Sequence, residues 1–366
     1  MASDGDIGMK KKVTIQDIAD ALGISRNTVS KAINNSEGLA EATREKILQK
    51  AIEMEYKQFS YVNSLAAAME DLKKDQIEDI RKEKKFRGEI ALLTTTFLTQ
   101  SHFASLMMDK FQREISQLGF TLNTHRVMPE DIAQKTLPYT FIQERCRAII
   151  CIEMFDREYD EMICALDLPV LFVDGPAKWD GYSLPADQLY MENATGIARF
   201  IHDSISAGRK RIGFIGKQLY CQSFFERYTA YRISLLMAGV EAEEKFIIDA
   251  QSAEGIRKEL AGLDELPDVF ICANDFVAID ALQVLTEMGK TVPDDVGLFG
   301  FDDSPESRLM IPRLTTVHIH TQIMAFVAVD MLLSRLEEPS LDYRIIHTET
   351  DLIYRDSTAP RPDAAK

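Results

Sequence analysis

Several features are absent from this chain of 366 residues, and each absence excludes a class of protein. No stretch contains the roughly 20 consecutive apolar residues of a membrane-spanning helix, and residues 1–8 lack the basic start and apolar centre of an export signal. The five cysteines include no Cys-x-x-Cys pair, which favours reduced thiols in a cytoplasmic protein. Walker A loops, nucleophile elbows and zinc-ligand spacings are also missing. We therefore expect a cytoplasmic protein with no membrane partner, metal, cofactor or catalytic residues.

A general excess of basic residues is missing too, since the formal net charge is −16. The charge is distributed unevenly, however. Residues 10–50 contain eight basic and five acidic residues, so this segment carries +3 and the remainder carries −19. Because DNA phosphates repel an acidic body, only the N-terminal segment is suited to approach DNA.

The N-terminal segment is predicted to form two short helices joined by a tight turn. The first has an apolar stripe at helical spacing, made of Ile15, Ile18, Ala19 and Leu22. Thr14 precedes it as a helix cap, with Asp17 three residues later, and Gly23 supplies the positive φ of a sharp helix end. Ser25 caps the second helix, whose Val29, Ala32 and Ile33 face inward. This arrangement predicts a helix-turn-helix.

Polar side chains are left on the outer face of the second helix. We expect Arg26, Asn27 and Lys31 to lie near base edges, because their guanidinium, amide and ammonium groups can hydrogen-bond with bases in the major groove. Four other polar residues of this segment are expected mainly to hold phosphates, namely Lys12, Ser25, Ser30 and Asn34.

Residues 14–34 resemble the head of the LacI/GalR family of bacterial repressors. The similarity lies in the run Ser25-x-x-Thr28-Val29-Ser30 and the closing Asn34, and it continues through Thr43-Arg44 and Ala51-Ile52 to Tyr56. The resemblance implies a three-helix DNA-binding head, a hinge and a two-lobed effector-binding core. It also implies a homodimer whose two heads read a palindromic, double-stranded operator. The residues assigned to DNA contact are Thr14, Ser25, Arg26, Asn27, Thr28, Ser30, Lys31, Asn34, Tyr56, Asn63 and Met69.

The segment after the head departs most from the family pattern. In one alignment Gln58-Phe59 replaces the usual Pro-Asn, and Leu65 is the residue that wedges into the minor groove. In the other, Val62-Asn63 replaces it and Met69 is the wedge. We favour the second alignment because it keeps Asn63 and Ala66. Ordinary helix packing explains either wedge residue equally well.

From residue 90 onward, short apolar strands alternate with helices. The predicted strands are 90–94, 121–127, 148–152, 170–174, 211–216, 246–249, 268–273 and 296–300. This alternation is typical of parallel sheets covered by helices on both faces, and eight strands suit two such lobes. The resemblance implies the same periplasmic-binding-protein-like core. The predicted fold class is therefore α/β: an N-terminal three-helix helix-turn-helix head and a two-lobed core of parallel sheets flanked by helices.

The expected domains are a head at 1–57, an atypical hinge with a charged helical linker at 58–88, and an effector-binding core at 89–360. The lobe boundaries expected within the core are 89–198 with 318–345 for the N-lobe, and 199–317 with 346–360 for the C-lobe. The chain is expected to cross between lobes near Asp187 and at 316–320. For residues 70–88 a dimer-pairing helix, a phosphate-contacting helix and a flexible linker all stay open.

Polar residues follow several predicted strands, and the carboxyl ends of parallel strands face a ligand cleft. By resemblance, Arg227, Asn274 and Asp302 form the centre of an effector site, and Thr95 and Asp187 are second-tier candidates. A carboxylate accepts hydrogen bonds from sugar hydroxyls, an arginine donates them and an asparagine does both. The resemblance implies that the effector is a sugar or a sugar phosphate. The alternative is that Arg227 forms a structural salt bridge and does not contact the effector.

The expected function is that of a sequence-specific DNA-binding regulator, a repressor of carbohydrate-utilisation genes whose operator affinity changes with the effector. The alternative is a sugar-acting enzyme with an accessory DNA-binding head. Asp302-Asp303 invites that comparison, since glycosidases use paired carboxylates. Adjacent side chains on an extended chain point in opposite directions, however, which disfavours the enzyme.

Overall fold

The computed structural model describes residues 14–33, 43, 46–47, 50–51, 54, 86–96 and 102–358. The chain divides into two compact units, residues 1–85 and 86–366. The expectations for the hinge and linker, and for Asn34, Tyr56, Asn63 and Met69, lie outside the described residues. None of the described helices combines the length and the apolar character that crossing a bilayer requires.

The first helix of the head, α1 (Ile15–Leu22), begins and ends as its sequence predicts. The Thr14 backbone N–H donates to Asp17 Oδ2 at 2.7 Å, and the Asp17 N–H donates to Thr14 Oγ1 at 3.3 Å. These reciprocal hydrogen bonds form a capping box. Gly23 ends the helix with a φ of 66°, a left-handed conformation that glycine adopts without steric cost.

The second helix, α2 (Arg26–Ile33), packs against α1. Ser25 Oγ accepts a hydrogen bond from the Thr28 N–H at 3.1 Å, so Ser25 caps the helix as predicted. The buried apolar residues of the head are Ile18, Ala19, Val29, Ala32, Ile47 and Ala51. Ile47 and Ala51 come from the region of the predicted third helix and complete a small common core.

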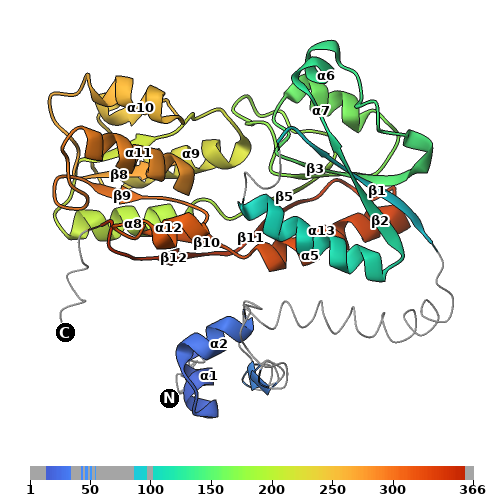
Figure 1. Ribbon diagram of the computed structural model, residues 1–366, viewed down its shortest axis with the longest axis horizontal. Coiled ribbons are helices and arrows are strands. Elements are labelled where there is room, and N and C mark those ends of the chain that lie inside the picture. The colour runs from blue at the N-terminus through green and yellow to red at the C-terminus, as the bar shows by residue number, and fades with distance from the viewer. Residues whose placement is uncertain are drawn as a thin grey trace, which may run out of the picture. The chain divides into compact units, whose positions relative to one another are not determined.

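The N-lobe is built on a six-stranded parallel sheet with the order β11-β5-β4-β3-β1-β2. Its strands are β1 (Gly88–Thr94), β2 (Phe120–Arg126), β3 (Cys146–Ile152), β4 (Val170–Val173), β5 (Asp187–Met191) and β11 (Ile345–Thr348). The helices α5 (His102–Gln117) and α13 (Thr321–Glu337) pack together on one side of this sheet. The other side carries α6 (Pro129–Gln134) and α7 (Arg157–Cys164) (Figure 1). Helices therefore cover both faces, as the alternation predicts.

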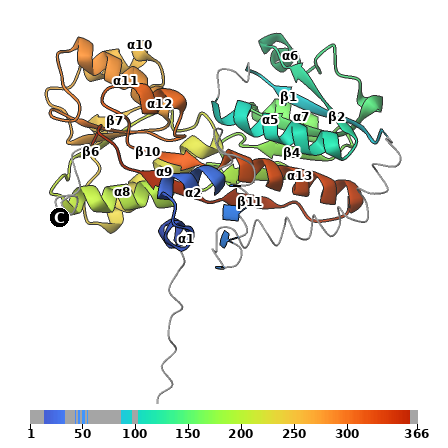
Figure 2. The same cartoon turned by 60° about the horizontal axis from the view of Figure 1, so that its bottom comes forward.

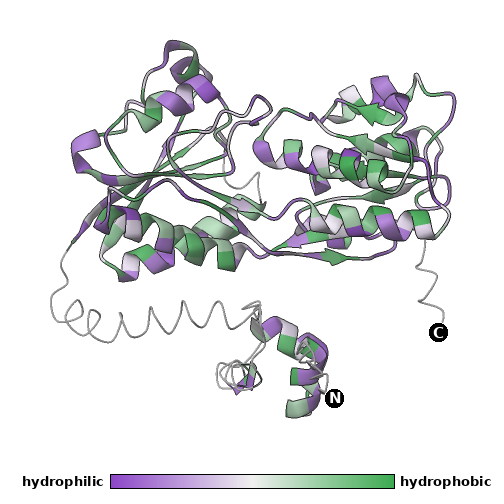
Figure 3. Ribbon diagram, turned by 180° about the vertical axis from the view of Figure 1, so that it is seen from behind, coloured by the Kyte–Doolittle hydropathy of each residue, from purple (hydrophilic) through white to green (hydrophobic). Residues whose placement is uncertain are grey.

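The C-lobe repeats this architecture with a four-stranded parallel sheet in the order β7-β6-β8-β9. Its strands are β6 (Ile212–Ile215), β7 (Ile247–Ile248), β8 (Val269–Cys272) and β9 (Gly297–Phe299). Its helices are α8 (Thr195–Ser206), α9 (Gln222–Met237), α10 (Ala253–Leu260), α11 (Asp275–Glu287) and the short α12 (Pro305–Leu309). α8 packs against α9, and α10 packs against α11. Hydrophobic residues concentrate on the strands of both lobes (Figure 3).

Three chain segments connect the lobes. The first runs from β5 to α8, and the other two form an antiparallel pair of strands, β10 (Thr316–Ile319) and β12 (Thr350–Ile353). Between these strands the chain returns to the N-lobe to form α13 and β11 (Figure 2). The expected lobe boundaries at 198 and 345 therefore fall inside α8 and β11. β11 is not among the strands predicted from the sequence, and it lies at the edge of the N-lobe sheet, next to β5.

Candidate ligand-binding site

Acidic residues in an unusual backbone conformation follow three strands. Glu153 comes directly after β3 with a φ of 56°, Asp174 directly after β4 with 62°, and Asp302 shortly after β9 with 121°. Positive φ is uncommon for residues other than glycine and concentrates at functional sites. The carboxyl edges of the two sheets thus each carry acidic residues held in conformations that cost free energy.

Arg227 on α9 lies buried among these strand ends, with 3% of its side chain exposed. Its Nε donates to Asn193 Oδ1 at 2.9 Å, and its Nη1 donates to the Ala273 carbonyl at 2.7 Å. The guanidinium carbon lies 3.6 Å from the centre of the Phe301 ring, a close cation–π contact. These contacts fix the guanidinium group in place.

Asp302 faces Arg227, with 3.9 Å between Oδ1 and Nη1 and 17% of the Asp302 side chain exposed. Burial raises the pKa of Asp302 well above its ordinary value, Arg227 opposes that rise, and the carboxylates of Asp275, Glu153 and Asp174 add to it. Within the part of the chain that the structure describes, the carboxyl group of Asp302 accepts no hydrogen bond. It is therefore suited to accept one from a ligand.

Asn274, the third expected residue, is half-buried at the start of α11. Its Oδ1 accepts a hydrogen bond from the Val277 N–H at 3.0 Å, so the side chain caps the helix. The neighbouring Asp275 is fully buried and accepts hydrogen bonds from Thr316 Oγ1 at 2.6 Å and from the Ser304 N–H at 2.7 Å. Burial raises the pKa of Asp275 to about 6.

The two second-tier candidates have different surroundings. Thr95 donates from Oγ1 to the Glu153 carbonyl at 2.5 Å and so supports one of the acidic strand ends. Asp187 is 2% exposed and forms ion pairs inside the N-lobe with Arg335, at 3.0 Å, and with Arg344, at 3.4 Å. The structure brings Arg227 and Asp302 together, but it places the Asp187 carboxylate against these two arginines instead.

The adjacent Asp303 has a different environment from Asp302. Its carboxylate accepts hydrogen bonds from Arg308, Arg355 and His318. Although burial alone would raise its pKa, these partners lower it to about 2. Asp303 is thus a permanently ionised structural anchor between β10 and α12. The two neighbouring carboxyl groups do not act as a pair, which removes the basis of the enzyme alternative.

Sequence reasoning missed the contacts that join the two lobes at the start of α9. Cys221, the residue that precedes this helix, makes no side-chain cap. Instead Asp174 of the N-lobe accepts hydrogen bonds from the Ser223 N–H at 3.1 Å and from Ser223 Oγ at 2.5 Å. The Gln222 N–H donates to the Gly175 carbonyl at 2.8 Å. One lobe thus satisfies the N–H groups that the first turn of a helix in the other lobe leaves unpaired.

Asn193 is a second residue that sequence reasoning missed. It lies between β5 and α8 and is 2% exposed. Besides accepting from Arg227, it donates from Nδ2 to Glu226 Oε2 at 2.7 Å and to the Met191 carbonyl at 2.9 Å. In the sequence it is indistinguishable from any asparagine near a helix start, because Glu226 and Arg227, its partners on α9, lie more than 30 positions away.

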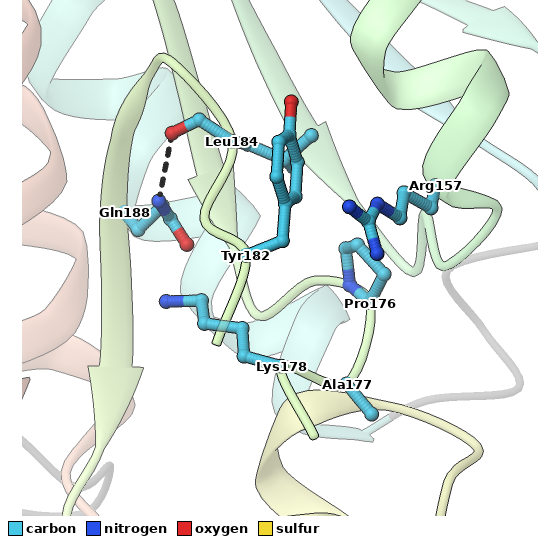
Figure 4. Close-up of a pocket in the computed structure, with 7 residues that line it drawn as sticks. All are labelled: Arg157, Pro176, Ala177, Lys178, Tyr182, Leu184 and Gln188. Carbon is cyan, nitrogen blue, oxygen red and sulfur yellow. Dashed lines mark hydrogen bonds between the residues drawn. The ribbon is translucent and has the colours of Figure 1, made fainter. Parts of the chain in front are cut away.

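A small pocket lies in the N-lobe beside the loop that connects β4 to β5 (Figure 4). Arg157 lines it, stacks over the Tyr182 ring at 3.8 Å and pairs with Asp180 at 2.5 Å. None of Arg227, Asn274 and Asp302 lines this pocket. Among the described residues, no group of three or more histidine, cysteine, aspartate or glutamate side chains is arranged to hold a metal ion.

In the head, Arg26, Asn27 and Lys31 are exposed on α2. Thr14 and Ser25 are exposed as well, but their hydroxyl groups serve as helix caps. Thr28 and Ser30 are half-buried, and Thr28 Oγ1 lies 2.8 Å from Ser25 Oγ. α2 therefore presents its cationic and amide side chains to the surroundings while its apolar side packs on α1.

The head and core together define a class of protein: a DNA-binding regulator in which a helix-turn-helix head precedes a two-lobed, periplasmic-binding-protein-like core. Residues 14–58 match the model of the lacI family of bacterial regulatory proteins, and residues 202–358 match a periplasmic binding protein-like domain. The head is thus a DNA-binding head of the lacI family of bacterial regulatory proteins. The curated relatives that match nearly the whole chain are named as transcriptional repressors or regulators.

Curated relatives extend over nearly the whole chain. The HTH-type transcriptional repressor PurR of Histophilus somni (strain 129Pt) is 24% identical over 351 residues, which cover 94% of this chain and 98% of the relative. The HTH-type transcriptional regulator GalR of Lacticaseibacillus casei is 27% identical over 362 residues, covering 94% and 99%.

Solved structures share the fold. The complex of the transcriptional regulator CelR with cellobiose has a TM-score of 0.64 at 22% identity and covers 94% of this chain and 99% of its own. The lac repressor dimer bound to operator and the anti-inducer ONPF has a TM-score of 0.63 at 22% identity, covering 95% and 99%. At these identities, both similarities show a common arrangement of helices and strands.

Proposed function

We propose that the protein represses carbohydrate-utilisation genes and that a sugar or sugar phosphate, bound between the lobes, changes its affinity for the operator. The observation that carries the proposal is the convergence of Arg227 and Asp302 at the strand ends. The fixed guanidinium and the Asp302 carboxyl group suit a ligand with several hydroxyl groups. The CelR–cellobiose complex, with the same fold, supports a sugar as the ligand class.

The head reads DNA in this proposal. A homodimer places two copies of α2 in successive major grooves of a palindromic operator, where Arg26, Asn27 and Lys31 contact base edges. Lys12, Ser25, Ser30 and Asn34 form the proposed phosphate-contacting set. Thr14, Thr28 and Tyr56 are also proposed to contact DNA. Asn63 and Met69 belong to the proposed hinge. The proposed domains are those expected from the sequence, at 1–57, 58–88 and 89–360.

The effector acts through the junction of the lobes. A ligand held by Arg227, Asn274 and Asp302 contacts the C-lobe, while Thr95 and Glu153 belong to the N-lobe. Binding that favours one relative placement of the lobes over another shifts the population of the core. Because the linker enters the N-lobe at β1, such a shift changes the spacing of the two heads and hence operator affinity.

The experiment selects a binding sequence from a pool of random duplexes and measures its affinity by fluorescence anisotropy. We expect a palindromic consensus, with affinity that falls by orders of magnitude as salt rises from 50 to 200 mM, since each phosphate contact releases counterions. Arg26→Ala should cost about 1–3 kcal/mol and relax the preference at one base position.

The matched control is Arg113→Ala, which removes an exposed arginine of α5 that pairs with Asp109. This variant should bind the selected duplex like the wild type. Failure to select any consensus, or equal losses for Arg26→Ala and Arg113→Ala, would contradict the proposal.

A further inference from the structure

We propose that Asn193 is a positioning residue: it orients Arg227 for the ligand and couples that orientation to the relative placement of the two lobes. This inference rests on the proposed effector site. Asn193 acts through its hydrogen bond with Arg227 and not through contact with the ligand. Its role follows from where it lies in the chain and from the three hydrogen bonds that its side chain makes.

The first step concerns the orientation of Arg227. An arginine side chain has several rotatable bonds, and holding it in one geometry requires fixed acceptors. Asn193 Oδ1 accepts from Nε at 2.9 Å, which sets the plane of the guanidinium, and the Ala273 carbonyl accepts from Nη1. With these two positions occupied, the guanidinium is directed along the Phe301 ring towards Asp302.

The second step concerns the lobes. Asn193 lies in the segment by which the chain leaves β5 of the N-lobe, and it stays attached to that strand through the Met191 carbonyl. Its other partners, Glu226 and Arg227, are consecutive residues of α9 in the C-lobe. One side chain thus links the end of an N-lobe strand to the helix that carries the ligand-binding arginine.

The third step concerns Glu226, which gathers further contacts between the lobes. Burial would raise its pKa, but hydrogen bonds from His347, Gln222 and Asn193 lower it. Gln222 Nε2 lies 2.8 Å from Glu226 Oε1, and His347 Nε2, on β11 of the N-lobe, lies 3.5 Å from it. A shift of Arg227 on ligand binding is therefore passed through Asn193 to a carboxylate that holds both lobes.

The first measurement follows the Arg227 Nε–H group by NMR on protein with 15N-labelled arginine. A buried, hydrogen-bonded Nε–H exchanges slowly with water and gives a persistent signal. The signal of Arg227 is assigned as the one that disappears in the Arg227→Lys variant. We expect Asn193→Ala to accelerate the exchange by at least about tenfold. Gln188→Ala, which removes another buried amide of the N-lobe with its own hydrogen bonds, should leave the exchange unchanged. An unchanged signal in Asn193→Ala overturns the positioning role.

The second measurement follows the lobes by the distance between spin labels at E130C on α6 and E259C on α10, both exposed positions. We expect one short distance in the wild type and in Gln188→Ala. Asn193→Ala should add a longer distance. The double variant N193D/E226Q should restore the short distance in part. It keeps an acceptor for Arg227 and exchanges donor and acceptor in the bond to residue 226, but it loses the bond to the Met191 carbonyl.

Asn193→Asp alone adds a pH readout. It places a carboxyl group against Glu226, and two carboxylates at hydrogen-bond distance cannot both ionise at low cost. The lobes should be together at pH 5, where one group holds a proton, and apart at pH 8. Arg227, Lys178, Asp174 and His347 are the other charged or titratable groups near this pair, so the wild type measured over the same pH range is the control.

The proposal is overturned if Asn193→Ala keeps the wild-type distances, if N193D/E226Q remains like Asn193→Ala, or if Asn193→Asp shows no pH dependence. Neither measurement uses DNA or an effector. A failure of operator binding would therefore leave these results intact, and a failure here would leave the DNA-binding proposal intact.

Discussion

Replacing Asp187 by asparagine tests whether this residue serves the fold or the ligand. Its carboxylate accepts two hydrogen bonds from Arg335, from Nε and Nη2, both at 3.0 Å, and one from the Arg344 backbone N–H at 2.8 Å. Arg335 is itself 5% exposed and also donates to the carbonyls of Pro339 and Asp342. The ion pair joins β5, α13 and the turn before β11, segments about 150 positions apart in the sequence.

The magnitude follows from the burial of both charges. Removing one partner of a buried ion pair leaves the other charge without compensation, which costs about 3–5 kcal/mol. The free energy of unfolding of a domain is about 5–15 kcal/mol, so we expect Asp187→Asn to remove a large part of the stability of the N-lobe. Asp356→Asn is the matched control. Its pair with Arg313 is more than half exposed, so the loss of stability should be far smaller than that of Asp187→Asn.

The assay is urea unfolding followed by circular dichroism between pH 3 and pH 8. Burial alone would raise the pKa of Asp187, but Arg335 and Arg344 lower it overall. A carboxylate with a lowered folded pKa contributes stability that is present above its unfolded pKa of about 3.9 and is lost as the pH falls through the folded value. The difference between wild type and Asp187→Asn should therefore be constant from pH 8 to pH 5 and shrink below about pH 4. A loss under 1 kcal/mol, together with impaired binding of a sugar, would refute the structural role.

Two further predictions concern buried positions of the core. Gly300→Ala should destabilise the C-lobe by about 1–3 kcal/mol in urea unfolding, because an added Cβ would clash with Asp275 Oδ1 and lie 2.6 Å from Leu314 Cδ2. The matched Gly262→Ala, in which the nearest atom to the added Cβ is 3.4 Å away, should cost little. Asp160 is fully buried, and none of the described residues donates a hydrogen bond to either of its carboxylate oxygens. Burial raises its pKa to about 8. Since the pKa of Asp160 is higher in the folded than in the unfolded protein, the wild type should lose stability as the pH rises from about 4 to 8. Asp160→Asn should be more stable than the wild type by up to about 4 kcal/mol at pH 7 and equally stable at pH 4. Parallel pH profiles of the two proteins would contradict this.

The sequence alone determined the features that depend on neighbouring residues. The capping box at Thr14, the left-handed Gly23 and the cap at Ser25 involve partners at most five positions apart, so their residue types predict them directly. The alternation of strands and helices is local too, and all eight strands predicted between residues 90 and 300 are present in the sheets of the core. The resemblance then supplied Arg227, Asn274 and Asp302 as a candidate site.

Only the tertiary structure decided which polar residues meet. Asp187 and Asp302 are both aspartates near strand ends, yet one pairs with two arginines inside the N-lobe and the other faces Arg227 without a hydrogen bond among the described residues. The hydrogen-bond partners of Asn193 and Asp174 lie on α9 of the C-lobe, 34 and 49 positions away in the sequence. Such pairings depend on how the two lobes are placed against each other. Many individually weak contacts determine that placement together, so it cannot be predicted from any single stretch of sequence.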